Sequence, residues 1–480
     1  MIRLSTERSS DCAILPSLFF EGKHNRICAG VHGGQTVRRP RTAMFESSPF
    51  PFKGEIMITV AKSVYYGVDD KPPVVQSVFY GLQHLLACFG ATVLVPILVG
   101  INPLYAIFSA GLGTLVYLVV TKFKVPNFVG SSFAFIAPAI LVLGQYGPGY
   151  LAGGAVVSGV FYCLIALLIY FAGPSWIHRI LPPVVIGPVV AVIGLALAGT
   201  AVSMASTGVN GEYSIHALVI AAITLLITIA ANYSKIPFVS SISIIIGLGG
   251  GYLITFLLGF VNPAFKFISF EVIKNAPAIN VPKFVVPEFN LAVIVTFAIV
   301  SLATICEHIG HTIVTGDIVG RDYVKDPGLH RTIAGDGLAT ALAGLTGSVC
   351  NTTYGESLGV LSTTKVYSVF VFIFAGAIAV LLSLFGKFGA FLQALPTPVL
   401  GGVCILLYGS IAINGLKQLV VNKIDFDDKR NLIIASIIFI LGVGGSRIAF
   451  PIGGFAFELG AIAVAALVGI ILNLIIPKSK

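Results

Sequence analysis

Two carboxylates in otherwise apolar segments are the residues of this sequence best suited to chemistry. Glu307 lies near the middle of a long apolar stretch, and Glu356 ends the segment 351–356 (NTTYGE) between two further apolar stretches. A charged group at membrane depth is costly, and it is retained mainly where it faces a polar cavity or a partner. Two such groups, each beside a helix-breaking signal, predict a transport site.

The spacing after Glu307 suits proton transfer. His311 follows four residues later, so in a helix the two side chains share a face and can interact. Burial disfavours the charged form of a carboxyl group, and a neighbouring imidazole moderates this effect. We therefore expect the pair to take up a proton on one side of a membrane and release it on the other. The alternative is a glutamate neutralised by a neighbour for packing alone.

Glu356 follows Gly355 at the expected start of a half-helix, where the helix dipole favours a carboxylate. A small planar ligand with alternating N–H and C=O groups suits such a site. Carboxylates accept from its N–H groups, while backbone N–H groups donate to its carbonyls. Phe133, Tyr354 and Tyr408 are candidates for the apolar faces against this ligand, with ordinary core packing as the alternative for each.

Other polar residues of these segments fit structural roles. His308 points about 100° away from Glu307 on a helix, so we expect a core histidine. Asp317 and Asp336 lie near the ends of their apolar segments, which predicts solvated or capping carboxylates. Segment 307–311 reads Glu-His-Ile-Gly-His, whereas a zinc protease requires H-E-x-x-H. We expect no enzyme activity, no metal and no cofactor, with protons as the coupling ion.

The composition indicates a polytopic membrane protein. Of 480 residues, 56% are hydrophobic and 10% are charged, whereas soluble domains carry about 25% charged residues. The net charge of +9 does not indicate a nucleic-acid partner, because Lys and Arg are spread between the apolar runs, as membrane topology requires. Seven cysteines without a CxxC pair predict neither a disulfide framework nor a metal site.

Apolar segments follow one another from about residue 75. A helix of about 20 apolar residues spans the hydrocarbon core, and fourteen candidates lie near residues 75–99, 102–120, 127–144, 148–172, 182–203, 214–232, 237–260, 290–318, 330–347, 350–364, 366–385, 390–413, 430–448 and 456–476. Short connections on one side carry most of the Lys and Arg, which predicts that both termini are cytoplasmic. Residues 1–56 differ in composition, and we expect a disordered tail or a mis-called start, with Met57 beginning the natural protein.

The two halves of the chain resemble each other. Three segments of the first half recur in order and at nearly one offset: 83–84 as 307–308, 131–135 as 352–356, and 181–187 as 395–401. Seven segments per half is an odd number, so the second half must enter the membrane from the opposite side. We therefore predict an all-α fold with 14 transmembrane segments in a 7+7 inverted repeat, as in many secondary transporters.

Segments 3 and 10 are expected to be interrupted. Small hydroxylated residues at 130–132 and 351–353 favour short extended stretches, which can pair as antiparallel strands. Backbone groups freed by such a break must be buried in protein or line a cavity. The alternative is that Ser and Thr bond back to the backbone within ordinary helices.

Six motifs occur together between about Pro72 and Pro477: GLQHL at 81–85, FGATVLVP at 89–96, GSSFAF at 130–135, EHIGH at 307–311, DPGLHR at 326–331 and NTTYGE at 351–356. In these motifs the chain resembles the nucleobase–ascorbate transporter family, specifically its bacterial uracil–proton symporters. Glu356 at the first position of the family signature resembles the uracil branch, since purine transporters usually place Gln there. Ser357 departs from the Asn that usually follows.

The resemblance implies a ligand site and a domain organisation. It implies that Glu307 and Glu356 bind the pyrimidine, with backbone contributions at Phe133 and Gly355, packing near Ala91 and Tyr408, and His311 as the partner of Glu307 in proton coupling. It implies homodimers in which a core domain moves against a gate domain. The expected boundaries are core 72–172 and 290–388, gate 175–260 and 389–477, and an external loop 261–289.

We therefore expect a proton-coupled symporter that imports uracil across a bacterial inner (cytoplasmic) membrane by elevator-like alternating access. A xanthine or purine permease of the same family is the nearest alternative. An anion exchanger on a similar scaffold is a further one, although an anion site should present a cation where this chain presents Glu356.

Overall fold

The computed structural model describes residues 65–477, except 283, 453 and 454. The chain divides into two units, Met1–Ala61 and Lys62–Lys480, and all described residues belong to the second. The tail or start expected within residues 1–56, and the two termini themselves, lie outside the described residues.

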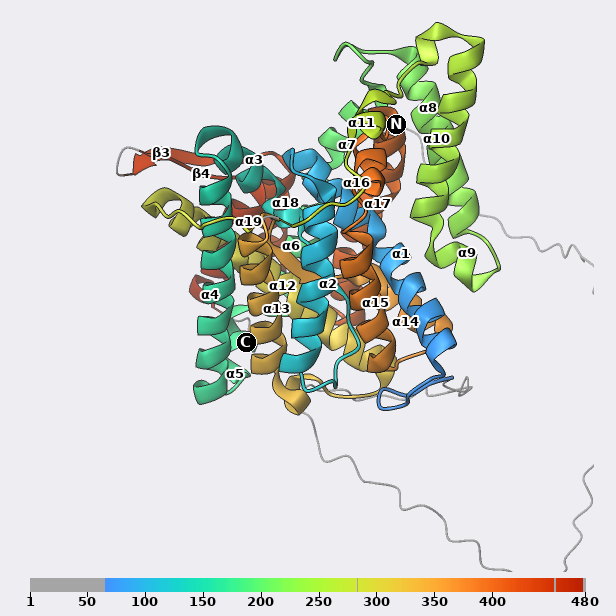
Figure 1. Cartoon of the computed structure of the whole chain (residues 1–480). Coiled ribbons are helices and arrows are strands. Elements are labelled where there is room, and N and C mark those ends of the chain that lie inside the picture. Colours follow the sequence, from blue (N-terminus) through green and yellow to red (C-terminus); the bar gives the residue numbers. More distant parts are fainter. Residues whose placement is uncertain (1–64, 283, 453–454, 478–480) are drawn as a thin grey trace, which may run out of the picture. The chain divides into compact units, whose positions relative to one another are not determined.

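The described chain is mostly helical (Figure 1). Its helices are α1 (Val74–Val99), α2 (Pro103–Val120), α3 (Ile136–Gln145), α4 (Pro148–Ala172), α5 (Ser175–Ile180), α6 (Pro183–Leu195), α7 (Ala198–Ser206), α8 (Ile215–Asn232), α9 (Pro237–Ser241), α10 (Ser243–Val261), α11 (Glu271–Asn275), α12 (Leu291–Val319), α13 (Leu329–Leu345), α14 (Gly355–Thr364), α15 (Val369–Leu382), α16 (Gly386–Gln393), α17 (Thr397–Val421), α18 (Lys429–Val443) and α19 (Ala461–Ile475). Shorter elements are the turns η1 (Phe133–Phe135), η2 (Pro263–Phe265) and η3 (Val324–Gly328), and the strands β1 (Val129–Ser131), β2 (Asn351–Thr353), β3 (Ile448–Ile452) and β4 (Phe455–Leu459).

Local sequence signals set the ends of the long helices. α2 begins after Asn102, whose Oδ1 accepts from the Leu104 N–H at 3.0 Å, and Pro103 occupies the first helical position, where its missing N–H costs nothing. α12 also begins after a capping asparagine, Asn290, whose Oδ1 accepts from the Val293 N–H at 2.7 Å. It ends at Gly320, whose φ of 79° lies in the left-handed region that glycine adopts without strain.

Eight helical stretches of the described residues are long and apolar enough to cross a membrane, and three shorter apolar helices accompany them. The chain is therefore a multi-pass membrane protein. The predicted spans at 127–144 and 350–364 are not continuous helices, because each begins with a strand and continues as a short helix. The predicted span at 182–203 is divided between α6 and α7.

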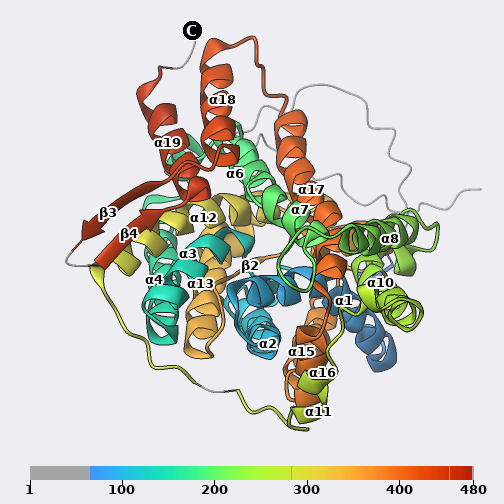
Figure 2. The ribbon, with the colours of Figure 1, turned by 90° about the horizontal axis from the view of Figure 1, so that it is seen from above.

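The helices form two packing groups (Figure 2). In one group α13 packs on α4 and α2, and α15 packs on α2 and α1; in the other, α17 packs on α6, α7 and α8, and α18 packs on α6 and α19. Glycine permits the closest crossings. A Cβ at Gly159 would lie 2.4 Å from the Gly337 carbonyl oxygen, and one at Gly415 would lie 2.2 Å from the Ala191 nitrogen. α12 contacts both groups.

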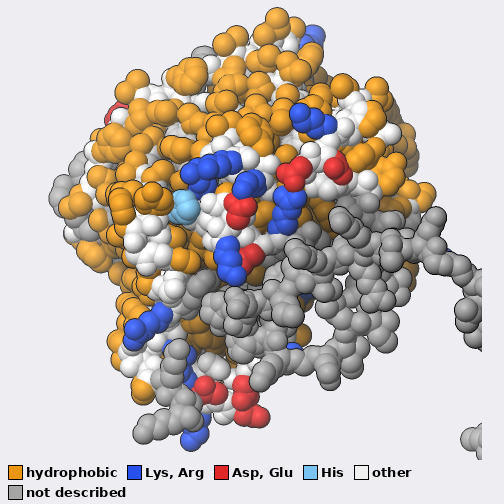
Figure 3. Space-filling model, turned by 90° about the horizontal axis from the view of Figure 1, so that it is seen from below, with side chains coloured by type: hydrophobic (Ala, Val, Ile, Leu, Met, Phe, Trp, Pro, Cys, Tyr) orange, Lys and Arg blue, Asp and Glu red, His pale blue; other side chains and the backbone are white. Residues whose placement is uncertain are grey.

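Charged side chains gather on one face of the helices, within a largely hydrophobic surround (Figure 3). Two ion pairs, both at 2.6 Å, tie the connection after α12 to other segments: Lys124–Asp326 to the connection after α2, and Arg321–Asp69 to the segment before α1. A third pair, Lys325–Asp322 at 3.4 Å, lies within the connection after α12. Because α2 has 18 residues, its two ends lie about 27 Å apart, so Asn102, which precedes α2, and Lys124, which follows it, lie beyond opposite ends of a helix long enough to cross a membrane.

Candidate functional site

Two short helices start from a pair of antiparallel strands inside the protein. β1 and β2 are antiparallel, with Val129 opposite Thr353 and Ser131 opposite Asn351, and all their residues are buried. The chain continues from β1 through η1 into α3, and from β2 directly into α14. Because the strands run in opposite directions and have three residues each, the two short helices begin at opposite ends of one short strand pair. The N-terminal ends of helices carry positive partial charge and unpaired N–H groups.

Side chains of neighbouring helices satisfy the outer edges of this two-stranded sheet. Thr114 of α2 exchanges hydrogen bonds with the backbone of Val129, accepting from its N–H at 3.0 Å and donating to its carbonyl at 3.3 Å. On the other edge, Thr340 of α13 donates to the Asn351 carbonyl at 2.9 Å. An extended backbone at membrane depth requires such partners, which explains why the strands lie between α2 and α13.

Glu307 and Glu356 come together at this site. Glu307 lies on α12, about 24 Å from its first residue and about 18 Å from its last, and is 9% exposed. Glu356 lies in the first turn of α14 and is half-buried. α12 and α14 are in contact, so the two carboxylates lie on adjoining elements. The Glu307 Oε2 atom is buried and has no hydrogen-bond partner among the described residues.

His311 contacts the strand pair. Its Nδ1 lies 2.9 Å from the Thr353 carbonyl oxygen, and because a carbonyl only accepts, Nδ1 carries the proton and donates. This leaves Nε2 on the opposite side of the ring, where it lies 3.1 Å from the position a Cβ would take on Gly355. His311 therefore reaches the first residue of α14 and completes the edge of β2, while it lies one helical turn from Glu307 on α12.

The predicted aromatic residues occupy two environments. Phe133 of η1 and Tyr408 of α17 are both buried and meet edge to face, with ring centroids 5.4 Å apart. Tyr354 is buried beside the strand pair, where its hydroxyl lies 3.1 Å from the Ser131 carbonyl and 3.1 Å from the Thr92 hydroxyl. Tyr354 thus fastens β2 to β1 and α1.

Ala91 and Gly355 are small residues on the elements around the strand pair. Ala91 is buried on α1, one residue before the threonine that meets Tyr354. α1 also contacts β1, α3 and α14. Gly355 is the first residue of α14. The structure therefore brings these two positions, from distant parts of the sequence, to the elements that surround the strand pair.

A buried contact between a carboxylate and a histidine beside the site was missed from the sequence. Asp336 is fully buried on α13, and its Oδ2 lies 2.9 Å from His308 Nδ1. The prediction of a solvated or capping Asp336 was therefore wrong, because position along a helix does not reveal which face packs inward. The expectation of a core histidine at His308 is confirmed. The sequence signal that could have revealed the burial of Asp336 is its position between two glycines in an apolar helix.

The residue in the unusual signature position has a defined contact. The Ser357 hydroxyl lies 3.1 Å from His84 Nδ1 of α1, and both side chains are buried. Gln83, which precedes His84, donates to the Ser241 hydroxyl of α9 at 2.7 Å. Gln83 and His84 thus act between helices, and Ser357 links α14 to α1.

The arrangement can bind a neutral ligand that offers N–H groups to two carboxylates and carbonyls to helix N-termini. Glu307 and Glu356 supply acceptors, the starts of α3 and α14 supply donors, and Phe133 and Tyr408 supply an apolar wall. Protonation of one carboxylate would remove the repulsion between the two. The site therefore suits a ligand whose binding is linked to a proton.

Comparisons with known proteins agree on one family. The model of the permease family matches residues 75–449. The uracil permease of Bacillus subtilis (strain 168) is 46% identical over 429 residues, which cover 87% of this chain and 97% of that protein. The uracil permease of Escherichia coli (strain K12) is 42% identical over 411 residues, covering 85% of this chain and 93% of that protein.

The fold also resembles a solved structure of remote sequence. The structure of SLC26A9 matches with a TM-score of 0.62 at 12% identity, covering 84% of this chain and 64% of that chain. At this identity the likeness concerns the fold alone. The match to the family model and the permease relatives show that the chain is a membrane transporter rather than an enzyme. It belongs to the permease family, in the branch of its uracil permease relatives.

Proposed function

We propose that the chain imports uracil together with protons across the cytoplasmic membrane. The observation that carries this proposal is the buried, unpartnered oxygen of Glu307 beside Glu356 at the start of α14. Relatives named uracil permease, at 42–46% identity over most of the chain, support uracil as the ligand.

Uracil fits the chemistry of the site. It is planar and neutral, and its two ring N–H groups alternate with two carbonyls. Glu356 accepts from N–H groups of the ring, and the backbone at Phe133 and Gly355 faces the carbonyls. Glu307 completes the site from α12, while Phe133, Tyr354, Ala91 and Tyr408 limit its size. Buried polar groups that match a ligand reject analogues that leave them unpaired.

Proton coupling follows from the two carboxylates. Glu307 enters the loaded state protonated, because a second negative charge beside Glu356 is unfavourable in a buried site. His311, one helical turn from Glu307 and in contact with the strand pair, is the group through which we propose that this proton exchanges. Release of the proton to the cytoplasm restores the repulsion and weakens the hold on uracil.

The packing groups support an elevator-like motion. We assign the core domain to 72–172 and 290–388 and the gate domain to 175–260 and 389–477, as two halves of a 14-segment, 7+7 inverted repeat. Contacts of α13 and α15 with α1, α2 and α4, and of α17 with α6, α7 and α8, agree with this division. We further propose a homodimer with both termini in the cytoplasm, on the side of the charged face.

Glu356→Gln tests the ligand site. A hydrogen bond to a charged group contributes about 1.5–3 kcal/mol, so the variant should bind uracil roughly 10- to 150-fold more weakly. Binding is measured on purified protein with radiolabelled uracil, and folding is checked by size-exclusion chromatography. Glu271→Gln, on exposed α11, is the matched control and should bind normally. Unchanged affinity in Glu356→Gln would reject the proposed site.

Glu307→Gln tests the coupling. The amide mimics the protonated acid, so uracil binding should persist, while uptake should lose its dependence on the proton gradient. Uptake in a permease-deficient strain, with and without a protonophore, measures this. Full gradient-driven uptake by the variant would contradict the role of Glu307. Competition by excess xanthine during uracil uptake separates a pyrimidine permease, which should be unaffected, from a purine permease.

A further inference from the structure

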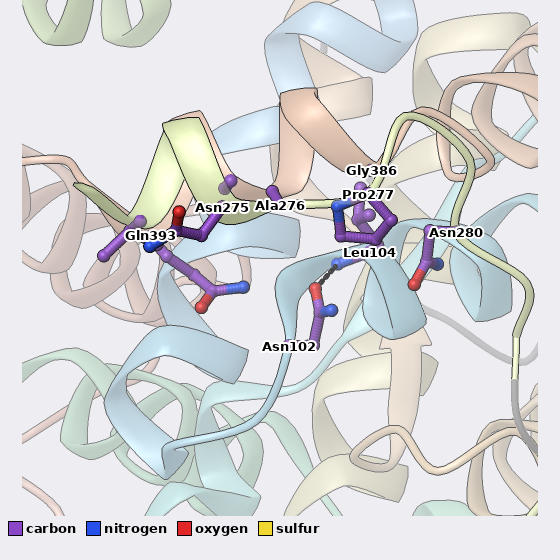
Figure 4. Close-up of a pocket in the computed structure, with 10 residues that line it drawn as sticks. Asn102, Leu104, Asn275, Ala276, Pro277, Asn280, Gly386 and Gln393 are labelled. Carbon is purple, nitrogen blue, oxygen red and sulfur yellow. Dashed lines mark hydrogen bonds between the residues drawn. The ribbon is translucent and has the colours of Figure 1, made fainter. Parts of the chain in front are cut away.

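A second recess lies at the opposite end of α2 from the charged face. It is formed by the N-terminus of α2, by α16, and by the connection between α10 and α12 around α11 (Figure 4). Its volume is about 360 Å³, within the range of roughly 300–1,000 Å³ typical of small-molecule sites. None of its lining residues is charged, and four carboxamides, those of Asn102, Asn275, Asn280 and Gln393, line it.

Backbone bonds hold the wall of this recess in place. The Gly386 N–H donates to the Ala278 carbonyl at 2.9 Å, and the Asn280 N–H donates to the Leu384 carbonyl at 2.7 Å. Lys387 donates to two carbonyls at the end of α11, each at 2.9 Å. The connection is therefore fastened to the turn between α15 and α16, so the recess is part of the folded structure.

Two of the carboxamides have a fixed orientation. The Oδ1 of Asn102 accepts from the Leu104 N–H at 3.0 Å, which leaves its Nδ2 as an open donor. The Nδ2 of Asn280 donates to the Ser383 carbonyl at 3.2 Å, which leaves its Oδ1 as an open acceptor. These bonds settle the assignment of nitrogen and oxygen, because a backbone N–H only donates and a carbonyl only accepts.

The other two carboxamides are uncommitted. The side chains of Asn275 and Gln393 form no hydrogen bond to another described residue. Figure 4 shows these two on one side of the recess, and Asn102 and Asn280 on the other. The recess therefore combines open N–H donors with open C=O acceptors and carries no charge.

We propose that this recess is a second, outward-facing binding site for small uncharged molecules that carry adjacent N–H and C=O groups, the chemistry of a cyclic amide such as uracil. The outward placement rests on the proposed function, since it takes the charged face as cytoplasmic. A carboxamide presents the same donor and acceptor pair as such a ligand, so paired hydrogen bonds form without a charge being desolvated. Because the recess is open and its hydrogen bonds are few, the expected dissociation constant is on the order of 1 mM.

Fluorine NMR of 5-fluorouracil with the purified full chain tests this proposal, because line broadening detects millimolar binding. Every sample carries Glu356→Gln to weaken the central site. We expect excess broadening that glutarimide reverses and that fluorobenzene does not show. Adding Asn275→Ala and Gln393→Ala should reduce the excess at least fivefold. Asn210→Ala, an exposed carboxamide in the turn between α7 and α8, is the matched control and should not change it.

Broadening that is absent, that glutarimide does not reverse, or that the Asn275→Ala/Gln393→Ala pair leaves unchanged would overturn the proposal. Both side chains of that pair are exposed, and glutarimide competition needs no variant in the recess, so a folding defect cannot mimic the result. A different measurement would contradict the proposed function, namely the absence of uracil uptake by the unmodified chain. The two failures are therefore distinguishable.

Discussion

His311 has two ring nitrogens with different tasks, and two substitutions separate them. Nδ1 donates to the Thr353 carbonyl at 2.9 Å, and Nε2 faces Gly355 at the start of α14. The Asn side chain places an N–H near the position of Nδ1, whereas the Gln side chain reaches the position of Nε2. Neither amide takes up a proton. His311→Asn thus keeps the strand bond and removes the proton site, while His311→Gln removes both.

The structure sets the size of the effect. The Thr353 carbonyl belongs to a fully buried residue, and a buried acceptor without a donor costs about 1–3 kcal/mol. His311→Gln should lose stability of this order, because Nδ1 is the side-chain donor that reaches this carbonyl. His311→Asn should stay within about 0.5 kcal/mol of the unmodified chain, the range of a substitution that keeps its hydrogen bond.

Two assays provide the comparison. Thermal unfolding of purified protein, followed by size-exclusion chromatography, should rank the unmodified chain and His311→Asn together, with His311→Gln below them. Uracil uptake under an imposed pH gradient should lose its gradient dependence in both variants. Equal destabilisation of the two variants would refute the role of Nδ1 in holding β2. Gradient-driven uptake by His311→Asn at the normal rate would refute the role of Nε2 in proton exchange.

Substitutions of Gly130 and Asp336, each with a control, test how the site is supported. Gly130→Ala would place a Cβ 2.6 Å from the Tyr354 hydroxyl, so we expect uptake to fall and stability to drop by about 2–4 kcal/mol as two hydrogen bonds are displaced. The control Gly144→Ala, whose added Cβ would have no atom within 4 Å, should leave thermal unfolding and uptake unchanged. Asp336→Leu leaves the buried His308 Nδ1 without this partner and should cost about 1–3 kcal/mol, whereas Asp336→Asn should cost less, as measured by thermal unfolding of the purified variants.

The pattern of the sequence predicted the interrupted segments well. Clusters of small hydroxylated residues at 130–132 and 351–353 favoured extended backbone, and the structure has β1 and β2 there, paired antiparallel. The cost of a carboxylate at membrane depth singled out Glu307 and Glu356 as candidates, and they lie on α12 and α14, two helices in contact. Both inferences depend on a cost that the membrane imposes at every position, so they can be made from residue type alone.

Contacts between distant segments were beyond such reasoning. The i,i+4 rule placed His311 beside Glu307, but it does not include the strand edge that competes for Nδ1. In the same way, Asp336 was assigned to solvent from its position along the helix, although it is buried against His308. Each case depends on which face of a helix meets another element, and apolar residues surround membrane helices on all sides, so periodicity gives little guidance.

The bonds around the strand pair also determine which parts of the site can move together. β1 and β2 are hydrogen-bonded at their edges to Thr114 of α2, Thr340 of α13 and His311 of α12. In contrast, the contact of Phe133 with Tyr408 of α17 is made by two aromatic rings without a hydrogen bond between them. Sliding an aromatic contact leaves no buried polar group unpaired, whereas pulling a strand from its edge partners does. In the proposed motion, therefore, the ligand site travels with α2, α12 and α13, and the surface that slides is the one between Phe133 and α17.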